Sequence, residues 1–151
     1  MGEPPIILSL GPDASAYAPA LWVLLALFVG RVVGQVLVVL AHPPWLPEMK
    51  QWYSGLLPYP VLLPIQIVYI VVMTWIALDF TRGMGAFVTP RPGLGAALVW
   101  ISYVYAAGMI VRFVIWLRKT PAERRAWIPI IFHIVLAAFL WVFASWHAMH
   151  G

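Results

Sequence analysis

Five hydrogen-bonding side chains lie inside stretches of the sequence that are otherwise apolar. They are Arg31, Gln35, Gln66, Arg112 and His133. Each of them costs free energy in hydrocarbon, so polar residues within a membrane usually face a bundle interior or a polar cavity. Guanidinium, amide and imidazole groups can hydrogen-bond across helices or hold an anionic ligand.

The elements that must position these side chains are four apolar stretches, each long enough to cross a bilayer as a helix. About 20 residues, each rising roughly 1.5 Å, span a hydrocarbon layer of roughly 30 Å. The predicted spans are residues 20–41, 61–80, 95–117 and 128–148. The runs lack the alternation of a barrel strand. We therefore expect an all-α polytopic membrane protein, a four-transmembrane-helix bundle with short loops, in which residues 1–151 form a single transmembrane domain.

The composition agrees with a chain surrounded by lipid. Of its 151 residues, 64% are hydrophobic and 9% are charged, whereas about 25% of the residues in a soluble domain are charged. The absence of cysteine excludes disulfides, thiolate metal sites and cysteine nucleophiles. The formal net charge of +4 does not require a nucleic-acid partner, because the basic residues follow the positive-inside rule.

The basic residues predict an orientation in the membrane. The connections after the first and third spans carry Lys50, Arg118, Lys119, Arg124 and Arg125. The connection between the second and third spans carries only Arg82 and Arg91. By the positive-inside rule the more basic connections face the cytoplasm. We therefore expect a bacterial cytoplasmic membrane with both termini on its non-cytoplasmic side.

The connections contain signals of their own. Residues 42–60 are rich in proline and predict an irregular segment, whose Trp52 suits the headgroup layer. The sequence Thr-Pro-Ala-Glu at 120–123 matches a capping box with proline at the first helical position. It predicts a helix that begins at Pro121 and continues into the fourth span, with a kink at Pro129.

Depth along the predicted helices places the polar side chains in one layer. Arg31 lies almost at the centre of the first span, whereas Gln35, Gln66, Arg112 and His133 all lie about 7 Å from the midplane, toward the cytoplasmic side. No Asp or Glu lies near that depth in any span. The two arginines therefore need a counter-charge or a wet cavity.

Two interpretations of this layer stay open. In the structural one, the side chains hold the bundle together by hydrogen bonds worth about 0.6 kcal/mol a pair, and Arg112 reaches toward the interface. In the functional one, the layer is a ligand-binding site. An anionic ligand, an inward-drawn lipid headgroup or an acidic residue of a partner chain then neutralises the arginines. Arg31 is the first functional candidate, because it is farthest from water.

A stripe of small residues flanks Arg31. Ala26, Gly30 and Gly34 recur at intervals of four, which allows another helix to approach closely. That helix belongs either to the same bundle or to a second protein.

A second polar cluster is expected at the opposite end of the bundle. Asp79 and His147 have similar depths and can form a hydrogen bond, with Arg82 and His150 nearby; the alternative is that all four residues are solvated at the interface. His147 and His150 are three residues apart, but two histidines fall short of a ligand set, so no metal site is predicted.

The histidine spacing also raises the question of haem. His133 and His147 are fourteen residues apart, a separation that resembles that of paired axial histidines in cytochrome b helices. No histidine on another helix matches His147, and His42 lies about 10 Å from His133 along the membrane normal. Haem b would therefore need other ligands or a partner chain, and a quinone is the other cofactor considered.

The sequence contains no HExxH, Walker loop, GxSxG or paired carboxylates, so we expect no enzymatic activity. The primary hypothesis is a non-catalytic accessory or structural subunit whose partners are membrane lipid and other membrane protein subunits. The alternatives are a membrane-embedded module that binds quinone, haem or anionic lipid, and a component of a small transporter.

Overall fold

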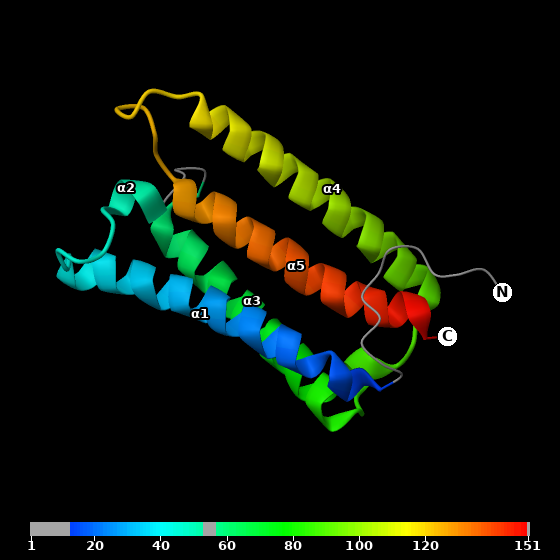
Figure 1. The fold of residues 1–151 in the computed structure, drawn as a ribbon. Coiled ribbons are helices and arrows are strands. Elements are labelled where there is room, and N and C mark those ends of the chain that lie inside the picture. The colour runs from blue at the N-terminus through cyan, green and yellow to red at the C-terminus, as the bar shows by residue number, and fades with distance from the viewer. Residues whose placement is uncertain (1–12, 53–56, 151) are drawn as a thin grey trace.

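The computed structural model describes residues 13–52 and 57–150. Within these ranges, four helices are long and apolar enough to cross a membrane (Figure 1). They are α1 (Ala18–Ala41), α3 (Tyr59–Arg82), α4 (Pro92–Leu117) and α5 (Trp127–Met149). Each contains one predicted span and extends it by a few residues. The chain is thus an all-α, four-transmembrane-helix bundle with short loops, as the hydropathy predicts.

Short helical segments occupy the connections. The 3-10 helix η1 (Ala14–Ala16) precedes α1, and η2 (Ala86–Val88) lies between α3 and α4. The proline-rich connection predicted to be irregular contains one short helix, α2 (Met49–Trp52). Residues 53–56 of that connection lie outside the described ranges.

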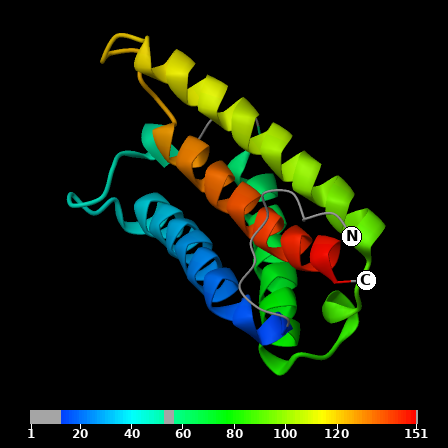
Figure 2. The ribbon, with the colours of Figure 1, turned by 45° about the vertical axis from the view of Figure 1, so that its right-hand side comes forward.

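Helix α5 is the central helix of the bundle. Helix α4 runs antiparallel along one side of it, and α1 packs on the other side and against α3 (Figures 1 and 2). The main apolar core lies among α1, α3 and α5 and includes Leu21, Phe28, Phe80 and Phe139. Helix α4 buries few side chains, and Trp100 on its outer face is 70% exposed. For that face the bilayer is the solvent.

The helix predicted to begin at Pro121 does not form, and this prediction is wrong. Residues 121–123 are a turn, and α5 begins only at Trp127, after Ala126 in the left-handed region (φ 54°). Half of the capping box is present, because the backbone N–H of Thr120 donates to Glu123 Oε2 at 3.1 Å. Pro129 lies in the first turn of α5, where its missing N–H removes no helical hydrogen bond and gives no cause for a kink.

No helix begins at Pro121 because the residues after α4 cap the C-terminal end of that helix. Arg124 donates from Nη2 to the carbonyl oxygen of Leu117 (2.9 Å) and from Nε to that of Lys119 (3.1 Å). Its guanidinium also lies 5.0 Å from the ring centroid of Trp116. These contacts satisfy carbonyl groups that the end of α4 leaves open, so the chain turns back on α4 before α5 begins.

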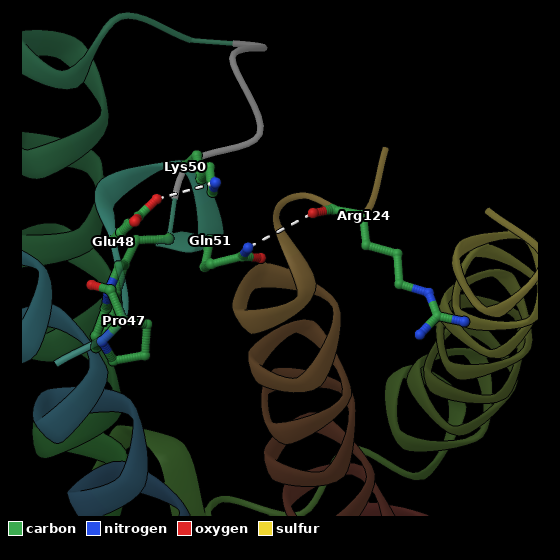
Figure 3. A network of polar contacts seen from close by, with 6 residues as sticks. Pro47, Glu48, Lys50, Gln51 and Arg124 are labelled. Atoms are coloured by element: carbon green, nitrogen blue, oxygen red, sulfur yellow. Dashed lines mark hydrogen bonds and ion pairs between the residues drawn. The ribbon is translucent and has the colours of Figure 1, made fainter. Parts of the chain in front are cut away.

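The two connections at the more basic end of the bundle are joined to each other. Gln51 Nε2 donates to the carbonyl oxygen of Arg124 at 3.5 Å (Figure 3), and the N–H of Ala126 donates to the carbonyl oxygen of Lys50 at 3.0 Å. Lys50 also forms an exposed ion pair with Glu48 at 3.0 Å (Figure 3). The start of α5 is thereby fixed to α2. That this end faces the cytoplasm stays a prediction.

Candidate functional site

Arg31 is a buried cation on α1, with only 7% of its surface exposed. Its guanidinium donates from Nη1 to Gln35 Oε1 at 3.1 Å and from Nη2 to the backbone carbonyl oxygen of Trp52 at 3.4 Å. Both acceptors are neutral. Among the residues that the structure describes, no carboxylate forms an ion pair with Arg31. Within the described part of the chain, dipoles alone stabilise its positive charge, although burying an ion costs several kcal/mol.

Two glutamine side chains extend this network from α1 to α3. Gln35 Oε1, which accepts from Arg31, also accepts from Gln66 Nε2 at 3.4 Å. Gln35 is fully buried, and Gln66 is 4% exposed. Within the described part of the chain, neither Gln66 Oε1 nor Gln35 Nε2 has a hydrogen-bond partner. Each unpaired buried group costs about 1–3 kcal/mol, so the site has unused hydrogen-bonding capacity.

His133 brings α5 and α4 to the same site. Its Nδ1 forms a hydrogen bond with the hydroxyl of Tyr105 on α4, and the two rings meet edge to face with a centroid separation of 5.7 Å. Tyr105 is not among the residues that the sequence singled out. Its position near the centre of the third span is a usable signal, because tyrosines that belong to an interfacial belt lie near span ends.

A cavity of about 80 Å³ lies between α1, α3 and α5, where these side chains meet. Arg31, Gln66 and His133 line it together with Tyr69, and the rest of the lining is apolar. A single water needs about 10–15 Å³ by this measure, so a small polar group fits beside the guanidinium. The predicted layer thus contributes three of its members to one cavity, and Gln35 joins them through hydrogen bonds.

A larger apolar groove of about 330 Å³ adjoins this cavity, between α3, α4 and α5. Tyr69 and Leu136 line both the cavity and the groove. Tyr105, which binds His133, lines the groove, and Phe143 lies at the part of it farthest along α5. The groove lies within the size range of about 300–1,000 Å³ that is typical of small-molecule sites.

Arg112 is the predicted member that does not reach this cavity. It is half-buried on α4 and does not line either space. Its charge lies within electrostatic range of Tyr105 and His133. Helix α4 therefore contributes Tyr105 to the site, about two turns from the arginine that the sequence indicated.

The stripe of small residues is divided between two environments. Ala26 and Gly30 are exposed on α1, and a Cβ atom at Gly30 would have no neighbour within 4 Å. A Cβ atom at Gly34 would lie 2.5 Å from Cη2 of Trp52, so this glycine accommodates an indole ring from α2. Trp52, expected in the headgroup layer, is buried, and its Nε1 donates to the carbonyl oxygen of Pro47 at 3.0 Å.

At the opposite end of the bundle, Asp79 and His147 are not hydrogen-bonded to each other. Both bind backbone groups of the connection between α3 and α4. Asp79 Oδ2 accepts from the N–H of Phe87 at 3.2 Å, and His147 Nε2 donates to the carbonyl oxygen of Phe87 at 2.8 Å. His147 Nδ1 accepts from the N–H of Arg91 at 3.2 Å. The two side chains are buried. Instead of the predicted direct hydrogen bond, each side chain therefore forms a hydrogen bond with the backbone of Phe87. Neither side chain is solvated.

The other two residues of this predicted cluster lie apart. Arg82 is exposed at the end of α3, and His150 stacks on Trp146 with a centroid separation of 4.9 Å. His147 uses both ring nitrogens for backbone hydrogen bonds, so it could bind haem iron only by giving one of them up. His42 is exposed at the end of α1. No group of three potential metal ligands occurs within residues 13–52 and 57–150.

No protein-family model, curated protein or solved structure matches this chain. The case for a function therefore depends on the site itself. Its main features are a buried guanidinium with no carboxylate partner among residues 13–52 and 57–150, and an adjoining apolar groove.

Proposed function

We propose that this membrane protein binds an amphiphilic ligand whose polar head lies in the cavity beside Arg31, Gln66 and His133. The observation that carries the proposal is the burial of the Arg31 guanidinium, whose hydrogen-bond acceptors among the described residues are all neutral. A ligand head that accepts hydrogen bonds there would compensate part of the cost of burying the charge. Among the three hypotheses from the sequence, the embedded binding module has the most support from this geometry.

The amide nitrogen of Gln35 adds to this argument. Within the described part of the chain it is a buried donor without a partner, and only an acceptor could satisfy it. Gln35 is hydrogen-bonded to Arg31 and Gln66, which both line the cavity. A network that served only to hold helices together would be expected to pair such a group, because an unsatisfied buried donor weakens the bundle.

The test is to identify what the purified protein retains. We expect mass spectrometry of a solvent extract, together with a visible-region spectrum, to show one amphiphile enriched over bulk lipid in the wild type. R31L should lose that enrichment. The matched control is R118L, which removes an exposed cation at the end of α4. Identical extracts from the wild type and R31L would refute the proposal.

A role as an accessory subunit is the second candidate. It is supported by the exposure of Ala26 and Gly30 on α1, where an added Cβ at Gly30 meets nothing. In that case an acidic residue of a partner chain would neutralise Arg31. Purification in a mild detergent should then yield a larger complex. A monomeric particle without any co-purifying protein would count against this role.

A further inference from the structure

We infer that the ligand is a single-chain amphiphile with a carboxylate head, which pairs with Arg31 while its chain follows the groove between α3, α4 and α5. This inference rests on the proposed function and specifies its ligand. Three independent features of the structure support it: the charge of the cavity, the depth of the site and the course of the groove.

The charge of the cavity favours an anionic head over a neutral one. A guanidinium has five N–H donors. Toward the residues that the structure describes, Arg31 uses Nη1 and Nη2 once each, for Gln35 and Trp52. The remaining donors suffice for a two-point hydrogen bond to a carboxylate, the geometry that arginine matches best. A neutral head, such as a quinone ring, could accept the same bonds but would leave the positive charge uncompensated.

The depth of the site favours one chain over two. Gln66 and His133 lie about 7 Å from the midpoints of α3 and α5, at roughly 1.5 Å a residue. The hydrocarbon layer extends roughly 15 Å from its midplane, so the site lies about 8 Å inside the boundary. A two-chain phospholipid would have to draw its glycerol backbone into the hydrocarbon to place a phosphate there. A single-chain acid can enter along its own axis.

The course of the groove matches an acyl chain. The groove adjoins the head cavity at Tyr69 and Leu136 and extends along α5 to Phe143. The groove itself, from Leu136 to Phe143, rises about 10 Å along α5. With the head beside His133, the path to Phe143 is about 15 Å, which equals the hydrocarbon thickness of one leaflet and hence the length of a membrane acyl chain. Apart from Tyr69 and Tyr105 the lining is aliphatic or phenyl, and it provides dispersion contacts along this length.

The experiment compares a fluorescent long-chain acid with its own methyl ester. Wild-type protein in nanodiscs of phosphatidylcholine is titrated with cis-parinaric acid and with methyl parinarate, and energy transfer from tryptophan reports binding. We expect saturable binding of the acid and at least tenfold weaker binding of the ester. R31L should reduce binding of the acid to the level of the ester, whereas the exposed-cation control R118L should leave both affinities unchanged. Equal affinity of the wild type for acid and ester would overturn the inference.

A second variant keeps the test valid if R31L does not fold. Val72 lines the groove and is 39% exposed, so V72F narrows the groove without entering the apolar core. We expect V72F to weaken acid and ester alike, because it acts on the chain and not on the head. Unchanged binding of both ligands to a folded V72F protein would refute the assignment of the groove.

Competition with unlabelled amphiphiles distinguishes a carboxylate head from a phosphate head and from a neutral head. Displacement of parinarate by oleate supports the carboxylate. Displacement by lysophosphatidate alone would overturn it in favour of a phosphate, and equal displacement by a short-chain quinone would overturn the anionic head. If the extract of the purified wild type contains an amphiphile that R31L loses, yet parinarate does not bind, this inference fails and the proposed function stands.

Discussion

Replacing Gly85 with alanine tests how closely the connection between α3 and α4 is fitted to Asp79. Gly85 has φ 126° and ψ −178°, a conformation that is essentially restricted to glycine. A Cβ atom at this position would overlap with the carboxylate of Asp79. Because that carboxylate accepts the N–H of Phe87, the alanine must displace either the connection or the hydrogen bond.

The expected cost has two parts. The backbone strain of a non-glycine residue in this region is about 1–3 kcal/mol, and loss of a hydrogen bond to a carboxylate costs about 1.5–3 kcal/mol. We therefore expect G85A to lower the free energy of unfolding by about 2.5–6 kcal/mol. G83A is the matched control. Gly83 has φ 66° and open space around the position of a Cβ, so its substitution should cost only about 1–2 kcal/mol.

The assay is reversible unfolding of the purified protein in detergent by sodium dodecyl sulfate, followed by tryptophan fluorescence. A double-mutant cycle with D79A separates the two contributions, because G85A in that background meets no carboxylate and retains only the strain. We expect G85A to cost about 1–3 kcal/mol there. An equal cost of G85A in both backgrounds would show that contact with Asp79 plays no part, and would refute the reasoning.

Two further predictions concern the more basic end of the bundle. G34L should displace the Trp52 indole and lower the free energy of unfolding by about 1–3 kcal/mol, whereas G30L should not lower it, because its side chain enters open space; equal losses in detergent unfolding would contradict this. The hydrogen bond from the backbone N–H of Thr120 lowers the pKa of the Glu123 carboxyl below its ordinary value of 4.5. The ionised carboxylate of Glu123 therefore stabilises the turn above the ordinary pKa of the group. This stabilisation is lost as the pH falls through the lowered pKa and the carboxylate is protonated. Amide exchange at Thr120, corrected for its intrinsic rate, should accelerate in that range in the wild type but not in E123Q, and a flat wild-type profile would contradict the assignment.

The sequence predicts depth in the membrane well, because hydropathy and the helical rise are properties of a single helix. The four spans and the shared level of Gln66 and His133 follow from it. It does not predict how far neighbouring helices are shifted along their axes relative to each other, which depends on packing between helices. Arg112 and Tyr105 are about two turns apart, so they share nearly the same face of α4 but differ by about 10 Å along its axis. Tyr105 is the one that contacts His133.

Contacts outside each local sequence pattern account for the other differences. The capping box at 120–123 is a local signal, and it was overridden by the bonds from Arg124 to the end of α4. The partnership of Asp79 and His147 depends on the backbone of Phe87, which no side-chain pattern reveals. Sequence patterns indicate which side chains need partners, but the backbone groups that serve as partners become visible only once the chain is folded.

The central place of α5 has a consequence for biosynthesis. Helices α1 and α3 contact each other and can pair as soon as both have been inserted, but α4 packs chiefly on α5, which follows it along the chain. During translation α4 therefore resides in the membrane without its principal neighbour until α5 arrives. Insertion of α5 then completes three associations together, with α1, α2 and α4. Most contacts between the helices consequently form only after the last helix, α5, has been inserted. Insertion of the helices and their association are thus separate steps.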